Sequence, residues 1–190
     1  MENMNRAVFL DRDGTLIVDV GYAHRIEDLS FFDGVIDGLL ALQSMGFLLI
    51  IATNQSGIAR GLFTERDYDS FTEAMLGQLA NAGVNITSVY HCPHLEGCTC
   101  RKPAIGMFEQ ATADWDIDLA SSYAIGDKLR DVSLCDKHTT TGIIISEESI
   151  TSFPEDNGER KGRLFVADSF VQAVKLVEEL EGSTKHESRR

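Results

Sequence analysis

The sequence predicts an α/β protein with a doubly wound, mainly parallel β-sheet, a Rossmann-like fold. Short apolar runs of strand length alternate along the chain with amphipathic stretches of helix length. These runs are apolar at consecutive positions, which is typical of parallel strands covered by helices on both faces. The chain has 190 residues and no internal repeat, which fits one domain. In such a sheet the active site lies beyond the carboxyl ends of the strands.

Hydrophobic periodicity places the expected elements along the chain. Strands are expected at residues 7–10, 47–52, 86–90, 122–125, 142–145 and 164–166, and helices at 35–42, 68–79, 105–115 and 169–180. Thr64 and Asp67 predict an N-cap for the second helix, and Cys135 is expected to be a small core residue on a helix. We expect a surface loop at 146–163, one domain over 1–180 and a flexible polar tail over 181–190.

The overall charge limits the kinds of partner. The chain carries 17 Lys and Arg against 30 Asp and Glu, a formal net charge of −13. This balance argues against a general nucleic-acid or anionic-membrane binder, because such proteins hold phosphates with basic residues. No apolar stretch has the length of a signal peptide or a membrane span. We therefore expect a cytoplasmic monomer that acts on a small molecule.

Two carboxylates follow the first expected strand directly, in the run Asp11-Arg12-Asp13-Gly14-Thr15. Two residues apart just past a buried strand, Asp11 and Asp13 can converge on one cation or one reacting centre. Gly14 allows the sharp backbone turn that this requires. The alternative is a loop whose acidic residues only cap a helix, and the other strand ends argue against it.

Each of the next strand ends carries groups of matching chemistry. In chain order they are Thr53, Asn54, Gln55 and Ser56, then Arg101 and Lys102, and then Asp127, Lys128 and Asp131. Hydroxyl, amide and basic groups suit phosphate oxygens, and carboxylates suit Mg²⁺. Because parallel strands end at one edge of the sheet, we expect a single site for phosphate and Mg²⁺ there.

These motifs resemble those of the haloacid dehalogenase superfamily of phosphohydrolases over residues 7–145. The resemblance implies that Asp11 attacks phosphorus to form an aspartyl-phosphate, and that Asp13 acts first as acid and then as base. It implies that Thr53 and Lys102 hold the oxygens of the transferring phosphoryl group. The implied Mg²⁺ ligands are Asp11, the backbone carbonyl of Asp13, and Asp127. A carboxylate can approach a phosphate dianion only where cations offset the repulsion, which agrees with these roles.

A second group of residues predicts a zinc site. Cys92, His94, Cys98 and Cys100 lie within nine residues of one another, and three thiolates with one imidazole fill the tetrahedral positions of a structural Zn²⁺ site. His91 competes with His94 as the nitrogen ligand. Four protein ligands leave no open position for water, so we expect a structural loop that fixes the direction of Arg101 and Lys102.

The zinc loop resembles the branch of the superfamily that contains the D,D-heptose 1,7-bisphosphate phosphatases and the histidinol-phosphate phosphatases. Within that branch, the runs Gly21–His24, Phe32–Val35 and Asn54–Gly61 resemble those of the heptose enzymes. This resemblance implies removal of the C7 phosphate of D-glycero-D-manno-heptose 1,7-bisphosphate, in the biosynthesis of nucleotide-activated heptose. The substrate contacts that it implies are Asp19, Val20, Gly21, Tyr22, Thr53, Asn54, Gln55, Ser56, Arg101, Lys102 and Lys128. Arg101 would recognise the second phosphate, a task that suits its bidentate fork.

Three alternatives remain open at this point. The first is a histidinol-phosphate phosphatase of histidine biosynthesis, because short zinc loops also occur in that branch. The second is a signalling domain that accepts a phosphoryl group on Asp11 and needs no acid at Asp13. The third is a zinc-based nucleic-acid module, which the acidic charge disfavours. No large cap domain is expected between Asp13 and Thr53, so loops alone would cover a small substrate.

Overall fold

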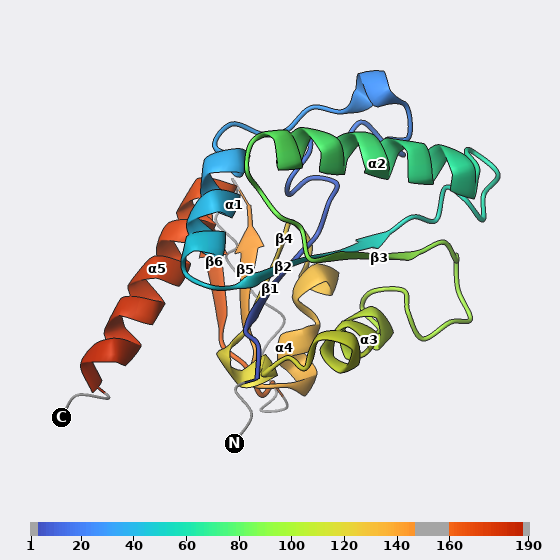
Figure 1. Ribbon diagram of the computed structural model, residues 1–190. Helices are drawn as coiled ribbons and strands as arrows, with labels where there is room; N and C mark the ends of the chain where they lie inside the picture. The colour runs from blue at the N-terminus through green and yellow to red at the C-terminus, as the bar shows by residue number, and fades with distance from the viewer. Residues whose placement is uncertain (1–3, 147–159, 188–190) are drawn as a thin grey trace.

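The structure, a computed structural model, describes residues 4–146 and 160–187 and has one six-stranded sheet (Figure 1). All neighbouring strands are parallel, in the order β3-β2-β1-β4-β5-β6. The strands are β1 (Ala7–Leu10), β2 (Leu48–Asn54), β3 (Ser88–Cys92), β4 (Tyr123–Gly126), β5 (Thr141–Ile145) and β6 (Leu164–Ala167). The expected fold class is confirmed, and this order is that of a doubly wound sheet.

Helices cover both faces of the sheet (Figure 1). Their bounds are α1 (Val35–Ser44), α2 (Glu65–Asn81), α3 (Gly106–Trp115), α4 (Leu134–Lys137) and α5 (Phe170–Glu187), with the short 3₁₀ helices η1 (Ile26–Asp28), η2 (Leu119–Ser121) and η3 (Leu129–Val132). One buried cluster joins the sheet to α1, α2 and α5 through Leu39, Phe71 and Val174. The other joins it to α3 and α4 through Phe108 and Leu134. Burial on both sides explains why the strands are continuously apolar.

Local signals and the structure agree at the start of α2. Thr64 Oγ1 accepts a hydrogen bond from the backbone N–H of Asp67 at 3.2 Å, and the N–H of Thr64 donates to Asp67 Oδ2 at 2.8 Å. This reciprocal pair is a capping box, as expected from the spacing. Cys135 is buried on α4, also as expected.

The ends of β2 and α5 differ from the expected ones. Strand β2 continues through Asn54, so Thr53 and Asn54 belong to the strand and have its rigidity. Helix α5 continues to Glu187, so residues 181–187 are helical, where a flexible tail was expected. Glu181 accounts for part of this difference, because its carboxylate binds Arg6 Nη1 at 2.5 Å and the Tyr123 hydroxyl at 3.0 Å. Most of the expected loop at 146–163 lies outside the described residues.

The topology places a crevice at the carboxyl ends of β1 and β4. These two strands are neighbours, but the connection after β1 leads to β2 on one side and the connection after β4 leads to β5 on the other. The described segment between β1 and α1 holds only the short helix η1 and no cap domain. The mouth of the crevice is therefore bordered by loops. No described helix has both the length and the apolar character needed to cross a membrane.

Candidate active site

A buried lysine lies between two carboxylates at the centre of the sheet edge. Lys102 Nζ is 2.6 Å from Asp11 Oδ1 and 2.7 Å from Asp131 Oδ1, and it also donates to the carbonyl oxygen of Ala52 at 2.6 Å. Asn54 holds the backbone of Lys102 in a reciprocal pair, in which Nδ2 donates to the lysine carbonyl and Oδ1 accepts from its N–H, each at 3.0 Å. The end of β2 thus positions the lysine that follows β3.

Asp11, Asp127 and Asp131 form a carboxylate cluster whose oxygens lie within 4.8 Å of one another. Gly14 allows this approach, because a Cβ built on it would lie 2.7 Å from Asp127 Oδ2 and its φ is +83°. A cluster of hard oxygen donors at this spacing fits Mg²⁺. The structure thus brings two of the expected metal ligands, Asp11 and Asp127, together, and Asp131 joins them.

The burial and the close carboxylates of this cluster shift the pKa values of its members. Burial, together with the carboxylates of Asp131 and Asp13, raises the pKa of Asp11 to about 7, although Lys102 opposes the rise. Burial alone would lower the pKa of Lys102, but the charges of Asp11 and Asp131 raise it above its ordinary value. One ammonium group therefore faces several carboxylates, and a dication would relieve their repulsion.

Asp13 is held by a set of donors of its own. Arg12 donates to both carboxylate oxygens, from Nε to Oδ2 at 2.9 Å and from Nη2 to Oδ1 at 2.8 Å. Gln55 Nε2 donates to Oδ2 at 2.9 Å, and Thr53 Oγ1 donates to it at 3.4 Å. Thr53 and Gln55 therefore contact Asp13 directly, while the carboxylate stays partly accessible from the crevice.

A cavity of about 360 Å³ opens beside Asp13. Its lining includes seven of the expected substrate contacts, namely Asp19, Gly21, Tyr22, Asn54, Gln55, Ser56 and Arg101. Arg60 and Arg130 also line it, so three guanidinium groups face one space. Thr53 and Lys102 are buried and do not line it. Two expected contacts lie elsewhere, since Val20 is about half exposed and Lys128 Nζ pairs with Asp127 Oδ2 at 2.8 Å.

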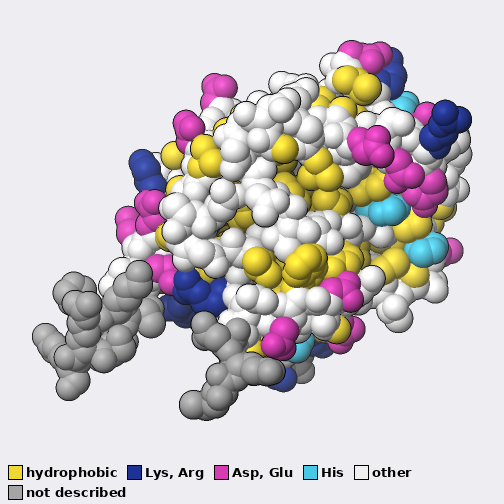
Figure 2. All heavy atoms as spheres, in the orientation of Figure 1, with side chains coloured by type: hydrophobic (Ala, Val, Ile, Leu, Met, Phe, Trp, Pro, Cys, Tyr) yellow, Lys and Arg dark blue, Asp and Glu magenta, His cyan; other side chains and the backbone are white. Residues whose placement is uncertain are grey.

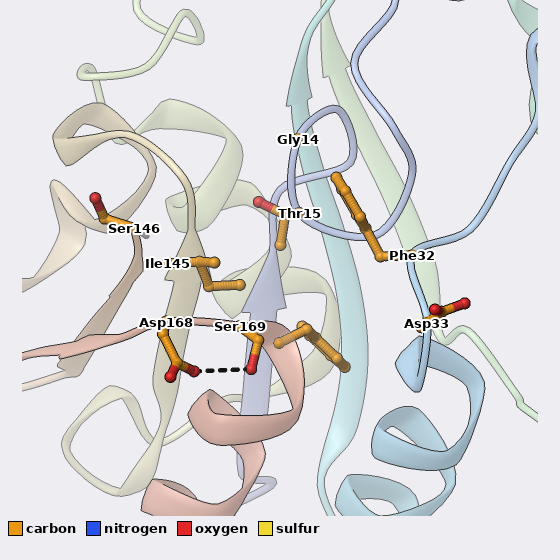
Figure 3. Close-up of a pocket in the computed structure, with 9 residues that line it drawn as sticks. Gly14, Thr15, Phe32, Asp33, Ile145, Ser146, Asp168 and Ser169 are labelled. Carbon is orange, nitrogen blue, oxygen red and sulfur yellow. Dashed lines mark hydrogen bonds between the residues drawn. The ribbon is translucent and has the colours of Figure 1, made fainter. Parts of the chain in front are cut away.

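A second cavity, of about 380 Å³, borders Gly14 and Thr15 (Figure 3). Phe32 and Ile145 give it apolar walls, and two carboxylates, Asp33 and Asp168, lie in its lining. None of its lining residues is Lys or Arg. Acidic side chains are also spread over the face of the molecule in Figure 2. The arginine-lined cavity beside Asp13 is therefore the one suited to anions.

The expected zinc ligands come together at the end of β3. Cys92, His94, Cys98 and Cys100 place one ligand atom each within 4.8 Å of the others. The Sγ atoms of Cys92 and Cys100 are 3.1 Å apart, and His94 Nδ1 is 3.3 Å from Cys100 Sγ. Three sulfurs and one ring nitrogen are the donor set of a closed Zn²⁺ site. His91 lies outside this cluster and instead places Nε2 3.0 Å from Glu65 Oε2.

The thiols of this cluster differ in how easily they ionise. Burial raises the pKa of Cys92 to about 12. At Cys98 partial burial acts in the same direction, but hydrogen bonds led by the backbone N–H of Arg101 lower the pKa to about 7. The loop also supports the arginine-lined cavity, because Arg101 Nη1 donates to the carbonyl of His94 at 3.2 Å.

Three residues of this site, Arg12, Arg60 and Arg130, had no expected role, and Asp131 was placed at the phosphate and Mg²⁺ site without a specific one. Arg12 is buried beneath Asp13, Asp131 pairs with Lys102, and Arg60 and Arg130 line the cavity. The signal for Asp131 was its spacing from Asp127. The signal for Arg60 was its place in the run Asn54–Gly61, which resembles that of the heptose enzymes.

Comparisons with known proteins identify the family. The sequence profile of the family described as Polynucleotide kinase 3 phosphatase matches residues 6–141. A D-glycero-beta-D-manno-heptose-1,7-bisphosphate 7-phosphatase from Haemophilus ducreyi is 44% identical over 183 residues, which cover 90% of this chain and 98% of that one. This chain belongs to the same phosphatase family, within the haloacid dehalogenase superfamily.

Other relatives agree with this placement. The enzyme of the same name from Yersinia pestis is 50% identical over 135 residues, 66% of this chain and 72% of that one. The crystal structure of D,D-heptose 1,7-bisphosphate phosphatase from B. bronchiseptica, complexed with magnesium and phosphate, has a TM-score of 0.80 at 26% identity. The match covers 92% of this chain and 98% of the B. bronchiseptica chain. The expected enzyme class, a phosphatase of this superfamily, is confirmed.

Proposed function

We propose that the chain removes the C7 phosphate of D-glycero-D-manno-heptose 1,7-bisphosphate, with Mg²⁺ as cofactor and an aspartyl-phosphate at Asp11 as intermediate. The names of its relatives support this substrate. The observation that carries the proposal is the cavity of about 360 Å³ that opens at Asp13 and is lined by Arg60, Arg101 and Arg130. A substrate with a second phosphate matches three guanidinium groups in one space.

The same cavity argues against the nearest alternative. Histidinol phosphate has one phosphate, and the rest of the molecule carries an ammonium group and an imidazole. Once that phosphate is at Asp11, the cationic end would face the three arginines at close range, where like charges repel. A sugar bisphosphate would instead place its second dianion there.

In the first chemical step, a carboxylate oxygen of Asp11 attacks phosphorus as the bond to the C7 oxygen breaks. Asp13 donates a proton to that leaving oxygen. Lys102 and Thr53 hold the oxygens of the transferring phosphoryl group, and the charge of Lys102 offsets the repulsion between carboxylate and phosphate. The Asn54 pair with the Lys102 backbone fixes the direction of that charge.

In the second step the charges and protons are restored. Asp13, now a carboxylate, accepts a proton from water, and the resulting hydroxide oxygen bonds to phosphorus as the Asp11–phosphorus bond breaks. Inorganic phosphate leaves and Asp11 regains its carboxylate. Asp11, the backbone carbonyl of Asp13, and Asp127 would hold Mg²⁺, with Asp131 close by. Mg²⁺, when bound, supplies positive charge for the carboxylates and phosphate oxygens.

We further propose that Cys92, His94, Cys98 and Cys100 hold one structural Zn²⁺. Its role is to stiffen the loop whose His94 carbonyl accepts the hydrogen bond from Arg101. Loss of zinc would then change recognition of the second phosphate before it changes the chemistry at Asp11. We also propose that residues 1–180 act as one unit and need no partner chain.

The substrate is tested by the release of inorganic phosphate at steady state. The proposal predicts a kcat/KM for the heptose bisphosphate at least about tenfold above that for histidinol phosphate. A 3′-phosphorylated oligonucleotide serves as the control for the broader family, and it should be a poor substrate because the chain is acidic. A tenfold preference for histidinol phosphate or for the oligonucleotide would refute the proposed substrate.

A further inference from the structure

We propose that Arg12 is a positioning residue for the reaction, one whose guanidinium sets the direction of the Asp13 carboxyl group. The inference rests on the proposed role of Asp13 as acid and base. It concerns where the carboxyl group points.

The contacts of Asp13 divide unevenly between its two oxygens. Oδ2 accepts hydrogen bonds from Arg12, Gln55 and Thr53. Among the described residues, Oδ1 accepts one only from Arg12 Nη2, at 2.8 Å. With Oδ2 alone held, the carboxyl group could turn about its last torsion, which has broad wells. The two-point contact of the guanidinium fork removes that freedom.

The surroundings of Arg12 hold its guanidinium in place. The residue is 1% exposed, and its guanidinium carbon lies 4.8 Å from the centre of the Phe71 ring and 5.8 Å from that of Tyr68, both on α2. Nη1 is buried without a hydrogen-bond partner in the described part of the chain. Burying a charge with an unmatched N–H group costs stability. This cost is more easily explained if the group serves the neighbouring site.

Arg12 also connects Asp13 to the substrate loop. Its Nη2 donates to the carbonyl oxygen of Ala23 at 3.0 Å. Asp19, Gly21 and Tyr22, just before Ala23, line the cavity beside Asp13. One guanidinium therefore ties the acid to the loop that borders the substrate, so the direction of the acid and the position of that loop are coupled.

The test uses the dependence on the leaving group, which a purely structural role would not change. A sugar alkoxide leaves poorly and needs a proton from Asp13, whereas p-nitrophenolate leaves with little help. The quantity compared is kcat/KM for 2-phenylethyl phosphate, whose alkoxide also leaves poorly, divided by kcat/KM for p-nitrophenyl phosphate. The two substrates are similar in size and neither has a second phosphate, so a shift of the loop at Ala23 would affect both alike. Because the enzyme concentration cancels in this ratio, partial unfolding of a variant does not affect it.

Arg12→Lys keeps the positive charge and loses the fork. We expect it to lower the ratio at least about tenfold. The matched control is Arg6→Lys, because Arg6 also binds a carboxylate, a carbonyl oxygen and an aromatic ring, namely Glu181, Met45 and Phe47. The control should leave the ratio unchanged within about twofold. Phe71→Leu, which removes the ring under the guanidinium, should lower the ratio by a smaller factor and serves if Arg12→Lys is inactive.

A third variant, Asp13→Asn, removes the proposed acid itself and should also lower the ratio. It shows whether a negative result concerns Arg12 alone or the proposed role of Asp13. If Asp13→Asn lowers the ratio but Arg12→Lys and Phe71→Leu do not, the role of Arg12 is wrong and the proposed function stands. If Asp13→Asn lowers both rates equally, the role of Asp13 is wrong and the inference falls with it.

Discussion

Lys102 Nζ lies 2.6 Å from Asp11 Oδ1, although the two residues are 91 positions apart in the chain. Both side chains are nearly or fully buried, and the lysine also meets Asp131 at 2.7 Å. The contact forms because parallel strands deliver the ends of β1 and β3 to one edge of the sheet. It places a fixed positive charge beside the proposed nucleophile, and the ion pair links the stability of the fold to the chemistry.

Lys102→Met should therefore harm both stability and turnover. Removing the ammonium leaves Asp11 and Asp131 buried without their cation, a change that costs about 3–5 kcal/mol in other buried pairs. We expect kcat to fall at least about a hundredfold, because the phosphoryl oxygens lose a donor. Urea unfolding and steady-state kinetics measure the two effects. Lys175→Met, at an exposed position on α5, is the control; a Lys102 variant as stable as this control would contradict the account.

The pKa of Asp11 predicts an unusual pH dependence in the metal-free protein. Since burial raises that pKa from 3.8 to about 7, the folded state holds a proton that the unfolded state has lost between these values. The contribution of Asp11 to stability is therefore full below pH 3.8 and is lost as the pH rises towards 7. Urea unfolding in EDTA should show this fall, and Mg²⁺ should reduce it. Asp11→Asn should give a flatter profile, and identical profiles for the two proteins would refute the assignment.

The sequence predicted the sheet and most of the site because both depend on local patterns. Continuous apolar runs indicated the strands, and the polar groups after them belong to one edge in any parallel sheet. Arg12 could not be recognised in the same way. Its burial depends on Phe71 and Tyr68, which reach it only because α2 packs over the β1 end. The helical residues 181–187 were missed for a similar reason, since Glu181 is anchored by Arg6 and Tyr123, both distant in sequence.

Cys98→Ser tests the zinc loop. We expect loss of about one zinc ion per chain and a lower Tm, because structural zinc contributes folding energy. KM for the bisphosphate should rise more than kcat falls, because the loop holds Arg101 through the His94 carbonyl. Elemental analysis, thermal melting and kinetics measure these effects. Cys135→Ala, in the core and outside the cluster, should keep its zinc; a Cys98 variant with full zinc content would count against the site.

Gly14→Ala tests the carboxylate cluster without removing a ligand. The new Cβ would lie 2.7 Å from Asp127 Oδ2 at a residue whose φ is +83°, so Asp127 must move. We expect the Mg²⁺ concentration needed for half-maximal activity to rise at least about tenfold. Gly77→Ala is the control, because it lies in α2 with open space around it and should be neutral or slightly stabilising. An unchanged Mg²⁺ requirement in Gly14→Ala would argue against metal binding at Asp127.

The position of the bond that is broken tests the central claim most directly. ³¹P NMR can follow D-glycero-D-manno-heptose 1,7-bisphosphate during incubation with the protein and Mg²⁺, because the anomeric and C7 phosphates are chemically distinct. We predict that the C7 resonance disappears while inorganic phosphate appears and the anomeric resonance remains. Loss of the anomeric phosphate first, or no turnover of this substrate with Mg²⁺ present, would contradict the proposed function.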